Sequence, residues 1–194
     1  ITTIVLAGMG GSSLAPEVIA ESYGKKLFIL DSTDPNYLHH AISGDLSSTL
    51  VVVSSKSGST IETASARAAF AGAFTSAGLE LSQHMVVVTD PGSPLDLDAR
   101  AQGLSVVNAD PHVGGRFSAL SSFGLVPSAL AGVDVSLLLD AGYDCKKAFL
   151  SDAMAILDVA WLLTTQTDSK RFRASCRTAH PSECRQSAAF PPTN

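Results

Sequence analysis

Five short apolar runs, each followed by a polar turn and then by a helical pattern, constrain the fold of this chain more than any other feature. Uninterrupted apolar runs are typical of strands buried on both faces, and parallel strands need a long connection, usually a helix, between them. The sequence therefore predicts an α/β fold with a doubly wound, five-stranded parallel sheet. The predicted strands are residues 3–7, 27–30, 51–53, 85–89 and 104–107.

Helical patterns fill the spaces between these runs and continue beyond them. We expect Pro16 to sit in the first turn of the first helix, where proline is tolerated. We expect the apolar segment up to Ala131 to be a helix broken by Gly124 and Pro127. Residues 1–134 would then form one domain, residues 135–167 a helical extension and residues 168–194 an irregular tail. The other predicted helices are residues 14–23, a short one ending near 42, 61–77, 95–102, 135–150 and 152–165.

Composition excludes several classes of protein. The 194 residues are 45% hydrophobic and 16% charged with a net charge of -5, which fits a globular domain and argues against a nucleic-acid binder. No apolar run is long enough to span a membrane, and no signal peptide is recognisable. The three cysteines and five histidines lack metal-binding spacing, so we expect no metal, no cofactor and a cytoplasmic location. The chain starts at Ile1 rather than Met, which suggests that sequence upstream is missing.

The loop after the third predicted strand has the composition of an anion site. Ser55, Lys56, Ser57 and Thr60 lie between that strand and the next helix, whose unpaired N–H groups and dipole favour a negative charge. The lysine adds a positive charge and the hydroxyls add donors. The sequence therefore predicts a phosphate-binding loop.

A simpler interpretation of the same loop is a capping box. Ser59 would cap the helix, and Glu62, three residues later, would complete the box. This interpretation leaves Ser55, Lys56 and Ser57 unexplained, so we keep both.

Two further turns follow strands at the same predicted edge of the sheet. The turn at residues 8–13 has Ser13 where a dinucleotide fingerprint needs glycine, and the chain has no Walker A motif. It is either a tight turn or a place where Gly10 and Gly11 admit a ligand to the backbone while Ser12 donates a hydrogen bond. Arg116, after two glycines, is either a surface residue in a salt bridge or a fixed charge that stabilises an oxyanion.

Three segments taken together resemble the signatures of glucose-6-phosphate isomerases: Gly-Met-Gly-Gly-Ser at 8–12, Ser-Lys-Ser-Gly-Ser-Thr-Ile-Glu-Thr at 55–63 and Gly-Gly-Arg-Phe-Ser at 114–118. The residues of these motifs are most similar to those in the isomerase half of bacterial bifunctional transaldolase/glucose-6-phosphate isomerases. The resemblance covers about residues 1–134 and implies a flavodoxin-like sugar isomerase (SIS) domain.

The resemblance also implies roles for individual residues. Arg116 would stabilise the cis-enediolate formed during aldose-ketose exchange. The catalytic base of the family is a Glu from a second SIS domain, in a motif that this chain lacks; Glu17 and Glu62 are better explained by helix starts. The remaining implied positions would bind the sugar phosphate: Gly11, Ser12, Ser13, Ser55, Lys56, Ser57, Gly58, Ser59 and Thr60.

Three interpretations of the function remain open at this point. The chain is expected to be a fragment of an isomerase, inactive alone and dimeric in its full-length form. It could instead be a non-catalytic SIS module that senses a sugar phosphate, as in some transcription regulators. For this chain we expect a sugar phosphate as the partner, and no nucleic-acid or membrane partner. The third interpretation is the inactive product of a disrupted gene.

Overall fold

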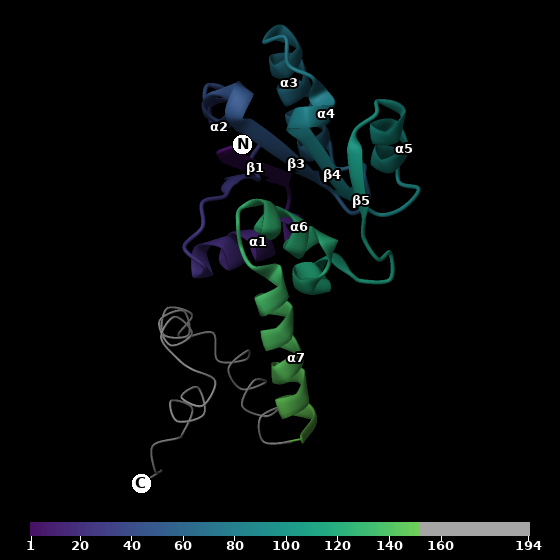
Figure 1. Ribbon diagram of the computed structural model, residues 1–194. Coiled ribbons are helices and arrows are strands. Elements are labelled where there is room, and N and C mark those ends of the chain that lie inside the picture. Colours follow the sequence, from purple (N-terminus) through teal and green to yellow (C-terminus); the bar gives the residue numbers. More distant parts are fainter. Residues whose placement is uncertain (152–194) are drawn as a thin grey trace. The chain divides into compact units, whose positions relative to one another are not determined.

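The computed structural model describes residues 1–151, with side chains through Lys147 (Figure 1). The chain divides into two compact units, residues 1–135 and residues 136–194. The predicted helix at 152–165 and the predicted tail at 168–194 lie outside the described residues. The predicted domain boundaries stay a prediction.

The first unit is built on a parallel sheet, and this confirms the predicted α/β class. Within the described residues the sheet has five strands in the order β2-β1-β3-β4-β5, and all neighbouring pairs are parallel. β3 is central, and all six of its residues are buried, because helices cover both faces. The strands are β1 (Thr3–Gly8), β2 (Phe28–Leu30), β3 (Thr49–Ser54), β4 (Met85–Thr89) and β5 (Ser105–Asn108).

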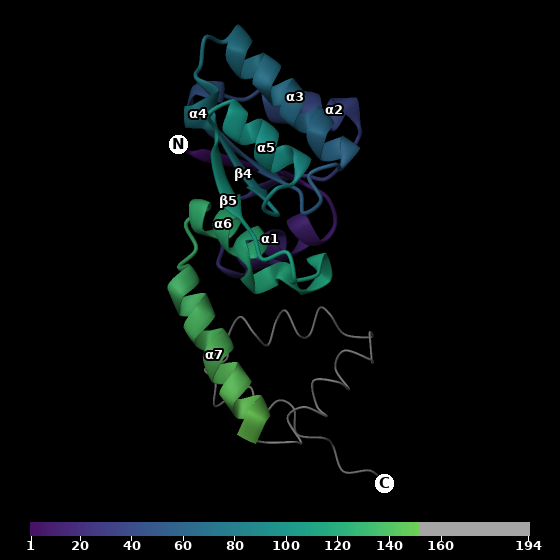
Figure 2. The ribbon, with the colours of Figure 1, turned by 90° about the vertical axis from the view of Figure 1, so that its right-hand side faces the viewer.

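Two layers of helices cover the sheet, α2 to α5 on one face and α1 and α6 on the other (Figures 1 and 2). Successive β3 side chains alternate between these layers: Val51 and Val53 join the core under α3, with Phe70 and Phe74, whereas Val52 joins Phe123 of α6. The helices are α1 (Gly11–Ser22), α2 (Pro35–Ile42), η1 (Leu46–Ser48), α3 (Ile61–Ser76), α4 (Leu81–His84), α5 (Pro94–Ala101), η2 (Gly115–Leu120) and α6 (Ser122–Leu130).

The strand order reverses between β1 and β3. The chain runs from β1 outward to β2 and then returns past β1 to β3, so that α1 and α3 leave the adjacent strand ends toward opposite faces. In sheets of this type the crevice beyond the carboxyl ends at the reversal is the ordinary ligand position. The turn at residues 8–13 and the loop at residues 55–60 both lie there.

Three local predictions about the helices are wrong. α1 begins at Gly11, so Pro16 lies in its second turn rather than its first. α6 runs without a break through Gly124 and Pro127. The start of α6 is capped by Ser121, whose hydroxyl accepts a hydrogen bond from the N–H of Phe123. Packing of the helix on the sheet offsets the loss of the one backbone hydrogen bond that proline cannot donate.

The capping box at the start of α3 is the third wrong prediction. The cap position is Thr60, not Ser59, and no side chain accepts a hydrogen bond from the first N–H groups of the helix. The Thr60 hydroxyl is hydrogen-bonded to Ser55 Oγ at 3.1 Å instead, because the strand-to-helix loop folds back on itself. The free N–H groups at this helix start are available to a ligand or to water.

The described part of the second unit belongs to one helix, α7 (Val135–Ser151), which begins at the last residue of the first unit and is close to its predicted range. Its exposed Lys147 lies over the ring of Tyr143, with the ammonium 4.3 Å from the ring centroid. Among all described residues, no helix is both long and apolar enough to cross a membrane.

Two glycines in helix interiors, Gly72 of α3 and Gly124 of α6, give a matched test of the packing. A Cβ at Gly124 would press against the backbone carbonyl of Ala119, whereas a Cβ at Gly72 would meet open space. We expect Gly124→Ala to lower the free energy of unfolding by about 1–3 kcal/mol through overpacking. Gly72→Ala should raise it by up to about 1 kcal/mol through helix propensity. Urea unfolding measures both, and equal effects would contradict the packing described for α6.

Candidate functional site

A cavity of about 440 Å³ lies beyond the carboxyl ends of β1, β3 and β4. Four segments far apart in the sequence form its walls: the β1–α1 turn, the β3–α3 loop, the β4–α5 turn and the start of η2. Hydroxyl side chains, glycines, one methionine and one charged pair make up its lining. The lining residues are Met9, Gly11, Ser12, Ser54, Ser55, Lys56, Ser57, Thr60, Asp90 and Gly115.

The cavity brings together most, but not all, of the residues predicted to contact a ligand. Gly58 and Ser59 stay outside its lining. Ser13 is fully buried, and its hydroxyl donates to the Gly10 carbonyl at 3.1 Å. Arg116 is exposed and follows the lining residue Gly115, without a hydrogen-bond or ion-pair partner among the described residues. The ligand-binding roles of all these residues remain predictions, and Gly11, Ser12, Ser55, Lys56, Ser57 and Thr60 are the predicted residues that share the cavity.

The loop at residues 55–60 is held by its own hydroxyl groups. Ser55 Oγ accepts the N–H of Gly58 at 3.2 Å, in addition to its bond with Thr60. Ser57 Oγ accepts both the N–H and the hydroxyl of Ser59, at 3.2 and 3.0 Å. The Ser57 hydroxyl proton is therefore still available as a donor. Ser55 and Ser57 thus both shape the loop and line the cavity, whereas Ser59 shapes the loop from outside the lining.

Gly58 fixes this loop against the start of α5. Its φ of +68° is in the left-handed region, and a Cβ there would lie 2.8 Å from Ser93 Oγ and 2.9 Å from Leu95. The loop is also tied to β4, because Thr89 Oγ1 donates to the Ser55 carbonyl at 2.6 Å. The position of the predicted phosphate loop is therefore set by β4 and α5 as well as by its own strand.

A second close backbone approach joins the other two walls. A Cβ on Gly11 would press into the carbonyl group of Gly115, which shows that the β1–α1 turn and η2 touch through their main chains. This contact places Ser12 beside the Gly-Gly-Arg segment. Gly11 is needed here for close approach rather than for flexibility.

Lys56 is already paired, and this was not predicted. Its Nζ donates to Asp90 Oδ2 at 2.6 Å and to the backbone carbonyls of Pro111 and Asp110 at 3.2 and 3.5 Å. The sequence pattern predicts Lys56 as a free positive charge and gives Asp90 no role. The signal that could have found the pair is an Asp directly after an apolar strand, at the same sheet edge as the lysine.

A carboxylate network supports the β4–α5 turn behind the cavity. Asp96 Oδ2 accepts the N–H of Gly92 at 2.8 Å and Oδ1 accepts Arg100 Nε at 2.7 Å. The hydrogen bond from Gly92, followed by the side-chain hydrogen bond from Arg100, lowers the pKa of Asp96 below its ordinary value of 3.8. Ser93 Oγ, in the same turn, contacts Thr89 Oγ1 at 2.8 Å. Asp96 therefore holds the turn against which Gly58 packs.

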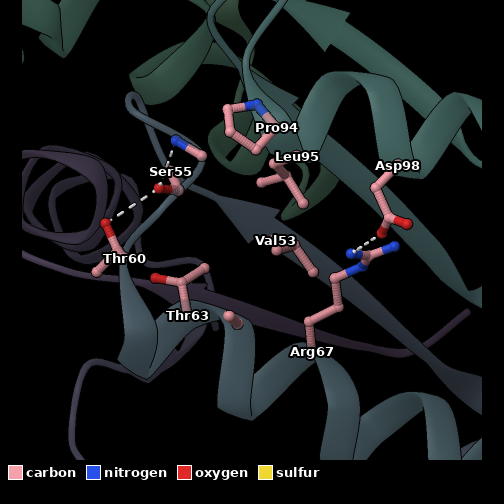
Figure 3. A pocket seen from close by; sticks show the side chains of 10 residues that line it. Val53, Ser55, Thr60, Thr63, Arg67, Pro94, Leu95 and Asp98 are labelled. Atoms are coloured by element: carbon pink, nitrogen blue, oxygen red, sulfur yellow. Dashed lines mark hydrogen bonds and ion pairs between the residues drawn. The ribbon is translucent and has the colours of Figure 1, made fainter.

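A second, smaller hollow of about 180 Å³ lies on the other side of the same loop (Figure 3). It shares Ser55 and Thr60 with the larger cavity, and an ion pair of 2.5 Å between Arg67 and Asp98 closes one end. The hydrogen bond from Arg67 lowers the pKa of Asp98. Within the described residues no group of three or more His, Cys, Asp or Glu is placed to hold a metal, and the expected absence of a metal or cofactor stays a prediction.

The contact between Gly11 and Gly115 predicts unequal effects of the same substitution at its two partners. Gly11→Ala must push the two segments apart, and we expect it to lower the free energy of unfolding by about 1–3 kcal/mol. Gly115→Ala places its methyl group in open space and should change the free energy of unfolding by less than about 0.5 kcal/mol. Denaturant unfolding of both variants checks this, and similar losses would rule out crowding at Gly11 as the cause.

The Asp96 network predicts a pH dependence of stability. The pKa of Asp96 is lower in the folded state than its value of about 3.9 in the unfolded chain. The ionised side chain therefore contributes to the free energy of unfolding above the unfolded pKa, and this contribution is lost as the pH falls through the folded pKa. Asp96→Asn should therefore be less stable than the parent at pH 6, with the difference shrinking toward pH 3. Urea unfolding across this range measures it, with the exposed Asp31→Asn as a control. A constant difference at every pH would contradict the assignment.

Comparison with known proteins identifies the family. The model of the family described as phosphoglucose isomerase matches residues 1–168. A glucose-6-phosphate isomerase of Citrifermentans bemidjiense is 38% identical over 88% of this chain and 35% of its own length. One of a Synechococcus strain is 36% identical over 84% of this chain and 33% of its own length. The chain thus spans about a third of these relatives.

Solved structures agree with this result. The crystal structure of a hypothetical protein from Thermus thermophilus has a TM-score of 0.77 and 35% identity, over 84% of this chain and 41% of that one. A glucose-6-phosphate isomerase from Chlamydia trachomatis has a TM-score of 0.61 and 36% identity, over 66% of this chain and 26% of that one. These comparisons confirm the resemblance seen in the motifs, and we conclude that this chain belongs to the phosphoglucose isomerase family.

Proposed function

We propose that this chain forms the sugar-phosphate-binding part of a glucose-6-phosphate isomerase, which interconverts glucose 6-phosphate and fructose 6-phosphate. The observation that carries the proposal is the convergence of three motif segments on one cavity. Its volume of about 440 Å³ is in the range of small-molecule sites. The family membership of the chain supports the same conclusion.

The phosphate group is proposed to lie at the start of α3. No side chain caps the first N–H groups of this helix, and the helix dipole favours a dianion there. The Ser57 hydroxyl can donate its proton, because it is an acceptor in both of its contacts with Ser59. Lys56 adds a positive charge at the same wall, and Gly58 and Ser59 hold the loop in shape.

The sugar is proposed to extend from there toward the β1–α1 turn. Ser12 lines the cavity, and its hydroxyl makes no hydrogen bond with the described part of the chain. Gly11 beside it exposes backbone without a side chain. A hydroxyl-rich ligand needs both donors and acceptors, and this wall offers them without adding charge.

The reaction needs a stabilised oxyanion and a carboxylate base. We propose that Arg116 supplies the positive charge for the enediolate, because it adjoins Gly115 and no carboxylate within the described residues neutralises it. Asp90 is the one carboxylate among the described lining residues, but it forms an ion pair with Lys56 and is therefore not proposed as the base. Glu17 and Glu62 are not part of the lining. The base that moves a proton between C2 and C1 is therefore proposed to come from another part of a longer isomerase.

Three finer assignments remain proposals from the sequence. They are a cytoplasmic location, a homodimeric full-length protein and a transaldolase segment in the same polypeptide. Composition and cysteine usage support the first, and the family resemblance supports the other two.

Ligand binding by the chain tests the proposed function. Calorimetry should detect fructose 6-phosphate binding and no binding of fructose, because the phosphate supplies most of the charge-dependent affinity. Ser57→Ala should weaken binding by about tenfold, as expected for one hydrogen bond to a charged group. Ser76→Ala, an exposed position at the other end of the same helix, serves as the control.

Turnover tests the proposed absence of the catalytic base. A coupled assay should show no isomerase activity in this chain alone, since the one carboxylate among the described lining residues, Asp90, is ion-paired with Lys56. Turnover at ordinary enzyme rates would contradict the proposed missing base. Failure to bind any sugar phosphate would contradict the proposed function itself.

A further inference from the structure

The one cation among the described residues that line the cavity is not free to meet an incoming anion. An ammonium group has three N–H donors, and all three of Lys56 have acceptors: Asp90 Oδ2 at 2.6 Å, the Pro111 carbonyl at 3.2 Å and the Asp110 carbonyl at 3.5 Å. From this geometry we propose that Asp90 is a positioning residue that masks Lys56 in the empty site. This proposal rests on the proposed function.

Asp90 is firmly placed to do this. It follows β4 directly, and its backbone N–H donates to the Lys56 carbonyl at 3.3 Å, so the two residues are joined by both main chain and side chain. Their side chains are 19% and 28% exposed, which leaves the pair less screened than one on the open surface. The short distance is typical of a charge-assisted hydrogen bond.

The three acceptors are unequal. The two carbonyls carry partial charges and their contacts are longer, so they are the bonds that a phosphate oxygen displaces first. Asp90 keeps the ammonium at the β4 side of the cavity while one donor turns inward. Its own negative charge also repels a dianion, because it lies in the same lining as Ser57 and Thr60.

The consequence is discrimination between ligands. A bare inorganic anion gains little from a lysine that a carboxylate already neutralises. A sugar phosphate makes further contacts with the β1–α1 turn at Ser12. The free energy of these contacts offsets the free energy needed to break the hydrogen bonds of Lys56 to the two carbonyls. Asp90 therefore lowers the affinity of the cavity for the phosphate group alone.

Lysine labelling in the absence of ligand tests the masking directly. Acylating reagents need access to the Nζ atom, and the hydrogen bonds of Nζ to Asp90 Oδ2 and to the two backbone carbonyls restrict that access in the parent chain. In Asp90→Asn, we expect Lys56 to be acylated at least threefold faster than in the parent chain, as measured by mass spectrometry. The exposed Lys25 and Lys26 should keep their rates and act as internal references.

Binding of inorganic phosphate gives the second readout. Calorimetry should show Asp90→Asn binding phosphate at least threefold more tightly than the parent, with no change in Asp31→Asn, which alters net charge equally but is not part of the lining. An unchanged labelling rate at Lys56, or phosphate binding that is equal or weaker, would overturn the proposal. If Asp90→Asn fails to fold by circular dichroism, Asp90→Ser carries the same expectations.

The two proposals fail separately. The proposed function is judged by fructose 6-phosphate binding to the parent chain, whereas masking is judged by the reactivity of Lys56 without any ligand. A chain that binds no sugar phosphate but shows faster labelling in Asp90→Asn would refute the first and keep the second.

Discussion

Burial of the central strand β3 is the constraint on which the rest of the molecule depends. Val51, Val52 and Val53 are fully buried, and they contribute to both cores, since alternate side chains point to opposite helix layers. A register shift of one residue would exchange the two sets of neighbours, so the end of the strand is fixed in space. The loop that begins at Ser55 inherits this position. A binding loop can thus carry polar groups because apolar burial elsewhere holds its start.

The cavity itself depends on close contacts at two glycines. Gly11 touches the backbone of Gly115, and Gly58 lies against Ser93 Oγ and Leu95, so that four segments approach closely where Gly11 and Gly58 have no side chain. The hydrogen bonds of Thr89 and the Asp96 network then support the loops from behind. The glycines allow the loops to pack closely, and this packing sets the positions of the hydroxyl groups that line the cavity.

Apolar patterning predicted the five strands, the doubly wound parallel sheet and most helix ranges, because these depend on local periodicity and on burial from both faces. It failed where a partner far along the chain decides the outcome. Thr60 turns to Ser55 instead of capping its helix, and Lys56 pairs with Asp90, 34 residues away. α6 passes through Gly124 and Pro127 because its packing outweighs local helix breakers. Motif positions indicated the cavity wall, but no local pattern indicated which hydroxyls build the loop and which face the ligand.

The outer strands of the sheet carry a consequence for association between molecules. β2 has three residues and β5 has four, so each edge presents few unpaired backbone groups. Long, flat edges invite edge-to-edge pairing and aggregation, and short ones do not offer a template of useful length. The apolar strands that make this sheet stable are thus kept in its middle, where another copy of the chain cannot reach them.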